Sequence, residues 1–182
     1  MPGISRVVVV GSSGSGKTTV AREVAARLDL PLLELDALAH RGGWDATPLD
    51  TFQQELRDFV KARRWVVDGN YSSRGTPEVV WPYADTFIWV DLPKRVVMRQ
   101  VVGRTLKRVF TREELWNGLS EPYTNLYSID PCQNIVVWSW TRFDHVRERY
   151  ESAIADGSWG HAKVYRLRLR GEIRDMLSSI DS

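Results

Sequence analysis

The chain has 182 residues, enough for one compact domain, whereas a second complete domain would be cramped. Its formal net charge is only +2, from 25 Lys and Arg against 23 Asp and Glu, so composition alone favours neither a nucleic-acid nor a membrane partner. Cys132 is the single cysteine, which excludes an intramolecular disulfide and argues against a cysteine-ligated zinc site. The N-terminal residues lack the pattern of a signal peptide, so we expect a soluble, cytoplasmic protein.

Five short apolar stretches, separated by longer helical patterns, predict the strands. They are residues 6–10, 32–35, 65–67, 86–90 and 163–169. Strands that alternate with helices are typical of βαβ units. The sequence therefore predicts an α/β domain with a parallel sheet.

Helical patterns fill the spaces between these stretches. Residues 48–60 carry apolar side chains at helical spacing, with Thr47 as the predicted N-cap and Pro48 as the first helical residue. Roughly seventy residues separate the last two predicted strands, more than a crossover needs. We expect a helical insertion there, over about 93–160, with helices that begin at Pro93 and after Thr111. A third covers 135–150, where one apolar stripe comprises Val136, Trp140, Phe143, Val146 and Tyr150.

The first predicted strand runs directly into a complete G-x-x-x-x-G-K-[ST] motif. Its residues are Gly11, Ser12, Ser13, Gly14, Ser15, Gly16, Lys17 and Thr18, followed by Thr19. The glycines allow successive backbone amides to point into one concavity, and the helix that follows adds the positive end of its dipole. The alternative is a flexible turn with a solvated lysine, which the strand-loop-helix setting disfavours. The motif predicts an ATP site, with Lys17 at the β- and γ-phosphates and Thr18 as a ligand of Mg²⁺.

Three aspartates follow predicted strands, where ligands bind in open parallel sheets. Asp68 is the candidate for holding Mg²⁺, directly or through water. Asp36 is the candidate for orienting or deprotonating the hydroxyl of an acceptor, or for binding the acceptor's polar groups. For Asp91 a role in a turn or helix cap is the preferred interpretation, because aspartate favours such positions after strands.

The stretch from Leu92 to Arg112 is basic and contains no acidic residue. Its seven cationic residues are Lys94, Arg95, Arg99, Arg104, Lys107, Arg108 and Arg112. Arg104 and Arg108 would share one helical face. After a phosphate loop, this predicts a lid that closes over ATP and neutralises the transferred phosphoryl group. A solvated helix face and a nucleic-acid contact are the alternatives, and no base-reading motif supports the second.

Two loops are expected at the same rim, where an acceptor must lie. Trp44 lies in the first, and the second offers Asn70, Tyr71 and Arg74. Trp44 or Tyr71 would stack on a ring of the acceptor or serve as a packing anchor. His40, in the first loop, is interpreted as an ordinary surface or hydrogen-bonded histidine.

The chain resembles the P-loop nucleotide-kinase superfamily, and within it the adenylate-kinase-related group known as topology modulation or FlaR-like proteins. The shared motifs run nearly end to end: GSSGSGKTT, LELDALAH, WVVDGNY, DTFIWVDLP, GRTLKR, TREELWNG and VYRLRLRGEIRDML. The resemblance implies a five-stranded parallel sheet in the order 2-3-1-4-5 flanked by helices, a helical lid, ATP and Mg²⁺.

Two departures bear on the acceptor. Adenylate kinases usually have Asp-Gly-x-Pro-Arg where this chain has Asp68-Gly69-Asn70-Tyr71, so the arginine expected at AMP is absent from its place and Arg74 is the candidate to compensate. Gln100 stands where the lid's leading arginine is usual, with Arg99 beside it. AMP is therefore not the predicted acceptor.

The sequence as a whole predicts a kinase that transfers the γ-phosphoryl of ATP to a nucleotide or another small molecule. The alternative is a nucleotide-dependent ATPase or regulator that binds nucleic acid through its basic helices. No membrane partner is expected, and both a monomer and a homodimer remain open.

Overall fold

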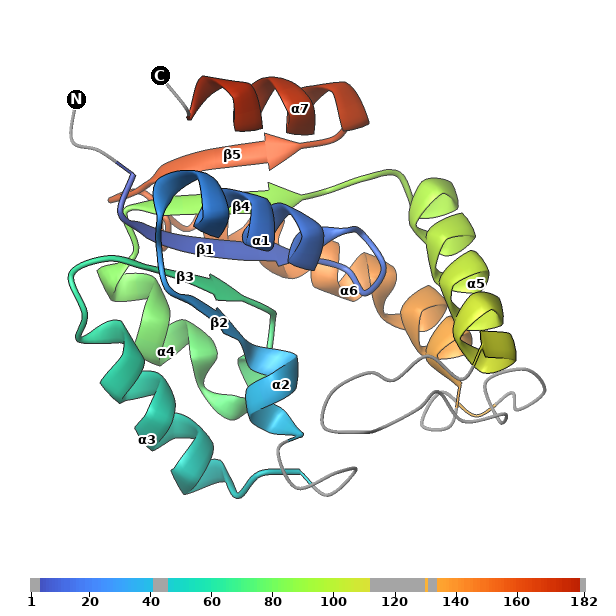
Figure 1. The fold of residues 1–182 in the computed structure, drawn as a ribbon, viewed down its shortest axis with the longest axis horizontal. Helices are drawn as coiled ribbons and strands as arrows, with labels where there is room; N and C mark the ends of the chain where they lie inside the picture. The colour runs from blue at the N-terminus through green and yellow to red at the C-terminus, as the bar shows by residue number, and fades with distance from the viewer. Residues whose placement is uncertain (1–3, 41–45, 112–129, 131–133, 181–182) are drawn as a thin grey trace.

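The computed structural model describes residues 4–40, 46–111, 130 and 134–180. Five parallel strands form one sheet in the order β2-β3-β1-β4-β5, as the resemblance implied (Figure 1). The strands are β1 Arg6–Gly11, β2 Leu32–Glu34, β3 Trp65–Asp68, β4 Thr86–Val90 and β5 Lys163–Leu167.

The sheet is covered on both faces, and the central strand β1 explains why. Residues 7–10 are four consecutive valines with exposures of 1% or less. Because successive side chains of a strand point to opposite faces, Val8 and Val10 enter one core while Val7 and Val9 enter the other. A run of β-branched residues without polar alternation is what a strand buried on both faces requires.

Helices supply the other half of each core. They are α1 Lys17–Leu28, α2 Leu35–Ala39, α3 Leu49–Val60, α4 Thr76–Val80, α5 Lys94–Thr111, α6 Ile135–Ala155 and α7 Arg170–Ser179. Side chains of α3 and most buried side chains of α6 join the core with Val8, whereas α1, α5 and α7 join the core with Val7. In Figure 1, α1 crosses in front of the sheet and α6 passes behind it.

Several local predictions differ from the structure. Helix α3 begins at Leu49 after Pro48, and the Thr47 hydroxyl donates to the carbonyl of Leu38 at 2.7 Å instead of capping α3. Thr111 is the last residue of α5, and its hydroxyl donates to the Lys107 carbonyl at 2.9 Å. The helix predicted after Thr111 lies outside the described residues.

The apolar stripe predicted for α6 is only partly buried. Trp140 is 55% exposed, and its ring lies 4.4 Å beneath the Lys94 ammonium of α5. Phe143, Val146 and Tyr150 are buried as expected. Helical spacing marked the apolar side chains correctly, but it did not show that α6 extends beyond the sheet at the end that carries Trp140.

None of the described helices combines the length and apolar character that crossing a membrane would require.

Candidate active site

The phosphate loop joins β1 to α1 in the conformation that its glycines allow. Gly14 and Gly16 adopt φ values of 79° and 94°, which L-amino acids with a Cβ rarely adopt. A Cβ on Gly14 would also collide with the side chain of Val101 of α5. Gly16 is the N-cap residue of α1 and has no side chain with which to satisfy the first amides of the helix. The loop therefore offers backbone N–H groups at a helix start to an anion.

Asp68 lies at the end of β3, opposite the start of α1. The Thr18 hydroxyl donates to Asp68 Oδ2 at 2.6 Å. Asp68 is only 2% exposed to solvent. Burial raises the pKa of the Asp68 carboxyl, while the charge of Lys17 and the hydrogen bond from Thr18 oppose that rise. Two of the residues predicted to hold Mg²⁺ are therefore in direct contact.

The donors at this position fit a magnesium ion. Asp68 Oδ1 is buried and has no hydrogen-bond partner among the described residues. A buried carboxylate oxygen without a donor is costly unless a cation or water satisfies it. The described part of the chain contains no group of three His, Cys, Asp or Glu that could hold a metal alone. Mg²⁺ is commonly held by one or two protein oxygens together with substrate phosphates, so this sparse set suits it.

Asp36 and Tyr71 lie near the same carboxyl edge. Asp36 belongs to the first turn of α2, two residues after β2 ends at Glu34, rather than directly at the end of the strand as predicted. A hydrogen bond with Asp36 and the charge of Asp36 add to burial in raising the pKa of the Tyr71 phenol. Tyr71 has a positive φ of 30°, a conformation that costs a non-glycine residue free energy and is often found at functional sites. Both residues were predicted to meet the acceptor, and the structure brings them together.

Asn70 was also predicted to contact the phosphoryl acceptor, but in the structure its side chain is hydrogen-bonded within the protein. Asn70 Nδ2 donates to the Gly11 carbonyl at 2.8 Å, and the Gly11 N–H donates to Asn70 Oδ1 at 3.3 Å. Tyr150 of α6 donates to the same Oδ1 at 2.7 Å. These contacts hold the amide against the phosphate loop.

Arg74, at the end of the 3₁₀ turn Ser72–Arg74, also has protein partners. Its guanidinium lies over the Phe52 ring, 4.6 Å from the centroid, and donates to the Thr47 carbonyl. Trp44, which was predicted to line the acceptor site, lies outside the described residues.

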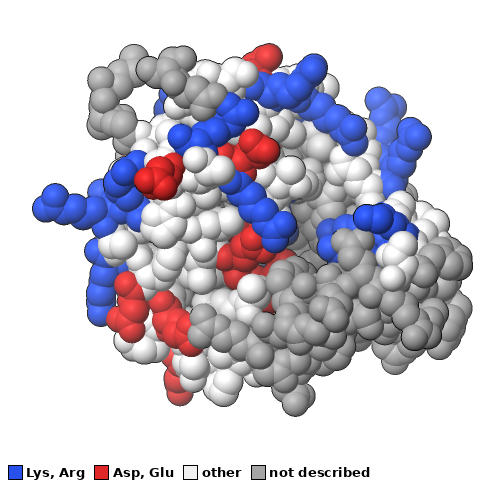
Figure 2. Space-filling view, viewed as in Figure 1, with Lys and Arg blue, Asp and Glu red and all other residues white. Residues whose placement is uncertain are grey.

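Helix α5 passes close to the phosphate loop. With its amide oriented to satisfy its neighbours, Gln100 donates to the Gly14 carbonyl at 2.6 Å and accepts from Arg170 at 2.8 Å. Arg104 and Arg108 follow Gln100 at intervals of four residues, so they continue the face that α5 presents to the loop. On the face shown in Figure 2, Lys and Arg side chains are spread out and interrupted by Asp and Glu.

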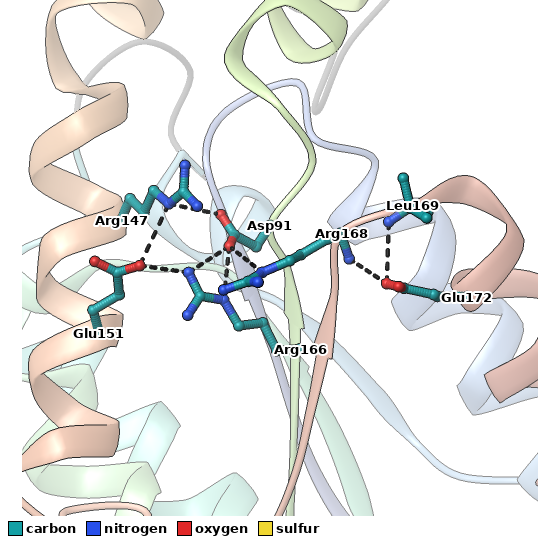
Figure 3. Close-up of polar contacts among 7 residues, drawn as sticks. All are labelled: Asp91, Arg147, Glu151, Arg166, Arg168, Leu169 and Glu172. Atoms are coloured by element: carbon teal, nitrogen blue, oxygen red, sulfur yellow. Dashed lines mark hydrogen bonds and ion pairs between the residues drawn. The ribbon is translucent and has the colours of Figure 1, made fainter.

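Asp91 follows β4 and gathers three arginines from different parts of the fold (Figure 3). Arg166 of β5 donates from Nε to Asp91 Oδ2 at 2.7 Å, and its guanidinium lies 4.0 Å from the centroid of a Trp89 ring. Arg147 of α6 and Arg168 are farther away, at 3.4 and 3.7 Å. The predicted structural role of Asp91 fits this arrangement, although its partners are arginines rather than a turn or cap.

Sequence reasoning did not place three residues, Tyr150, Gln100 and Asn70, against the phosphate loop or its supports. Tyr150 was assigned only to an apolar stripe, Gln100 only to a departure from a family pattern, and Asn70 to the acceptor. Two features of the sequence could have drawn attention to them: the hydroxyl of Tyr150 within an apolar stripe, and the amide of Asn70 directly after Asp68-Gly69. Neither signal identifies its partner, because the partners lie 80 and 59 positions away in the chain.

The chain is similar in sequence to known ATPases and nucleotide kinases. The sequence profile of the ATPase family associated with various cellular activities (AAA) matches residues 7–66, which include the phosphate loop and end within β3, before Asp68. The chain is 32% identical over 142 residues to a cytidylate kinase of Pyrobaculum calidifontis, across 68% of this chain and 76% of that protein. It is 31% identical to the cytidylate kinase of Pyrobaculum islandicum, with the same coverage.

Solved structures share the fold at low sequence identity. Shikimate kinase from Acinetobacter baumannii, in complex with shikimate, superposes with a TM-score of 0.57 at 15% identity, over 97% of this chain and 90% of that chain. A gluconokinase from Sinorhizobium meliloti 1021 superposes with a TM-score of 0.50 at 17% identity, over 98% of this chain and 91% of that chain.

Proposed function

This chain belongs to the P-loop nucleotide-kinase superfamily and is an ATP-dependent small-molecule kinase, and on that premise we propose which residues carry out the transfer and which acceptor they suit. The observation that carries the proposal is the 2.6 Å hydrogen bond from Thr18 to the buried Asp68 at the mouth of the phosphate loop. It brings the oxygen donors for a metal next to the amides for a triphosphate.

The donor side binds the triphosphate of ATP. The loop from Gly11 to Gly16 supplies backbone N–H groups, and the Lys17 ammonium meets the β- and γ-phosphates. Thr19, which is exposed in the first turn of α1, supports binding at the rim of the loop. Amides held by the turn from β1 into α1 can stabilise negative charge with little reorganisation.

Thr18 and Asp68 would hold Mg²⁺, with Asp68 Oδ1 as the available carboxylate oxygen. A bound Mg²⁺ supplies charge neutralisation to the phosphates during transfer. The Thr18 hydroxyl donates to Oδ2 of Asp68. Oδ1 has no donor among the described residues, so it is the oxygen available to the metal.

Asp36 receives the acceptor. Its carboxylate accepts the hydrogen of an acceptor hydroxyl, and the hydroxyl oxygen attacks the γ-phosphorus. The new bond joins that oxygen to phosphorus, the bond from phosphorus to the β-phosphate oxygen breaks, and the proton passes to Asp36. The Tyr71 phenol stays protonated because its pKa is raised, so it remains a donor that orients Asp36.

A hydroxyl-bearing acceptor suits the described residues better than a phosphate does. A carboxylate attracts hydroxyl hydrogens and repels phosphate. Arg74, the candidate cation for an acceptor phosphate, is held by the Phe52 ring and the Thr47 carbonyl, although its Nε has no hydrogen-bond partner among the described residues. The second candidate is a nucleoside monophosphate, which the similarity to cytidylate kinases favours.

The lid completes the site. We propose that residues of about 93–160 supply the lid within one kinase domain, with Arg104 and Arg108 as the groups that neutralise the transferred phosphoryl group. Their place on α5 supports this role, because one turn earlier the same helix contacts Gly14. The buried side chains of this span, such as Val97 of α5 and Tyr150 of α6, belong to the cores and would stay in place.

The test is an acceptor screen that measures ADP release with ATP and Mg²⁺. One arm contains sugars, hydroxy acids and nucleosides, and the other contains nucleoside monophosphates including CMP. We expect a phosphorylated product from the first arm, detected by mass spectrometry. A product only in the second arm would establish the second candidate.

Lys17→Ala is the matched control, with expected turnover lower by about 10³-fold because a preorganised charge at the phosphates is lost. ADP release that needs no acceptor but rises with DNA or RNA, and falls steeply with salt, would overturn the proposal.

A further inference from the structure

A three-residue stretch, Asp68-Gly69-Asn70, holds the phosphate loop at both of its ends. Asp68 accepts from Thr18, which follows the loop, and Asn70 is hydrogen-bonded to Gly11, which begins it. The chain leaves β3 after Asp68, and both side chains reach the loop from this short turn. Gly69, between them, has a φ of 132°, and a Cβ there would press against Leu35.

The contact of Asn70 with Gly11 uses both groups of the glycine's backbone. The carbonyl of Gly11 accepts from Nδ2 at 2.8 Å, and its N–H donates to Oδ1 at 3.3 Å. Because two successive peptide planes are held, the direction in which the chain enters the loop is determined. The orientation of Gly11 therefore sets the orientation of the next backbone N–H groups of the loop. An anion binds where these N–H groups converge.

Tyr150 holds the Asn70 amide in place from the opposite side. Its hydroxyl donates to Asn70 Oδ1 at 2.7 Å, and its ring is 1% exposed between Trp89 and Trp159, with centroids 5.7 and 5.5 Å away. Burial raises the pKa of the Tyr150 phenol, so it remains a neutral donor at physiological pH. A donor fixed by packing selects the amide orientation in which Nδ2 faces Gly11.

We propose that Asn70 and Tyr150 are positioning residues for ATP, with Tyr150 of α6 acting through Asn70 on the entry of the phosphate loop. This inference rests on the assignment of the loop to ATP. Asn70 was predicted to contact the acceptor, and that role would give a different result in the experiment below. Coupling through Asn70 also links α6 to the phosphate site by three hydrogen bonds.

The experiment is a double-mutant cycle on Mg²⁺-ATP affinity, measured by calorimetry without acceptor. Asn70→Ala is expected to weaken affinity about tenfold, as loss of a supporting partner commonly does. Tyr150→Phe removes one hydroxyl and is expected to weaken it about threefold. In the Asn70→Ala background Tyr150→Phe is expected to have no further effect, because residues that act through one another are not additive.

Tyr165→Phe is the matched control. It removes a hydroxyl from a half-buried tyrosine of β5, and we expect wild-type affinity. Circular dichroism and thermal unfolding establish that each variant is folded. If Asn70→Ala does not fold, exchange of the Gly11 amide in Tyr150→Phe, followed by NMR, replaces it, and faster exchange than in wild type is expected.

The outcomes separate this inference from the function itself. Wild-type protein that fails to bind Mg²⁺-ATP would overturn the proposed function. Normal ATP affinity in Asn70→Ala with a raised KM for the acceptor would overturn the positioning role alone, and would return Asn70 to the acceptor. Additive effects in the cycle, or unchanged exchange of the Gly11 amide, would overturn the role of Tyr150.

Discussion

Asp68 and Asp91 both lie at the carboxyl ends of the two strands that flank β1, yet their surroundings differ. Asp68 ends β3 and Asp91 follows β4, and their exposures are 2% and 6%. Asp68 has one hydroxyl donor and a buried oxygen without a donor among the described residues. Asp91 has three arginines around it (Figure 3).

The difference shows that burial at the carboxyl edge of a sheet does not by itself create a functional carboxylate. A buried charge must be compensated, and Asp91 is compensated entirely by the fold. Asp68 is compensated only in part, by the Thr18 hydroxyl and the charge of Lys17, so burial still raises its pKa and Oδ1 remains available to an external cation. A ligand site is therefore recognised by the polar capacity that the protein has not used.

The largest expected effect comes from neutralising the incompletely compensated carboxylate. Asp68→Asn keeps the shape of the side chain but loses its charge, so phosphoryl transfer should fall about 100-fold and its response to Mg²⁺ concentration should flatten. Steady-state kinetics across a magnesium titration measures both quantities. Thermal unfolding without ATP should show no loss of stability, and activity close to wild type would contradict the assigned role.

Neutralising the compensated carboxylate should affect stability instead. Asp91→Asn leaves Arg166, which is 22% exposed, facing a neutral amide, so we expect a loss of about 2 kcal/mol in the free energy of unfolding. This figure is below that for a fully buried pair because water reaches all three arginines. Urea unfolding provides the measurement, and a variant as stable as wild type would remove the contrast between the two aspartates.

The pH dependence of stability should sharpen the contrast further. The pKa of the Asp68 carboxyl is raised in the folded protein. Its contribution to stability is therefore complete below the pKa of Asp68 in the unfolded chain, about 4, and is lost as the pH rises through the pKa in the folded protein. Relative to Asp68→Asn, the wild type should therefore become less stable from acid toward neutral pH. Urea unfolding in EDTA across that range tests this, and parallel curves for the two proteins would argue against it.

The smallest effect is expected at the edge of the arginine cluster. Arg168 is 56% exposed and 3.7 Å from Asp91, so Arg168→Ala should change the free energy of unfolding by about 0.5 kcal/mol or less. Arg166→Ala serves as the comparison, because its guanidinium is closer to Asp91 and packs on Trp89. Equal losses in the two variants would show that distance and exposure do not rank these pairs.

Local sequence patterns were sufficient for the strands and for the phosphate loop, whereas the strand order came from the family resemblance. Four consecutive valines predict a strand buried on both faces, and the glycines with Lys17 and Thr18 predict the phosphate loop, because these features depend on residues near one another in the chain. Asp68 could also be placed, since the carboxyl ends of parallel strands share one edge. The sequence assignments of Asp36 and Arg104 to acceptor and lid remain predictions.

Only the tertiary structure shows which distant residues each polar side chain contacts. Asn70 reaches Gly11 and Tyr150, Arg74 turns to Phe52 and Thr47, and Asp91 collects arginines that lie between 56 and 77 positions later in the chain. Each side chain has a chemical capacity that the sequence displays, but the packing of helices on the sheet decides which atoms come within 3 Å of it. A hydrogen bond requires close approach and good alignment between residues far apart in the chain, so periodicity and motif spacing cannot reveal it.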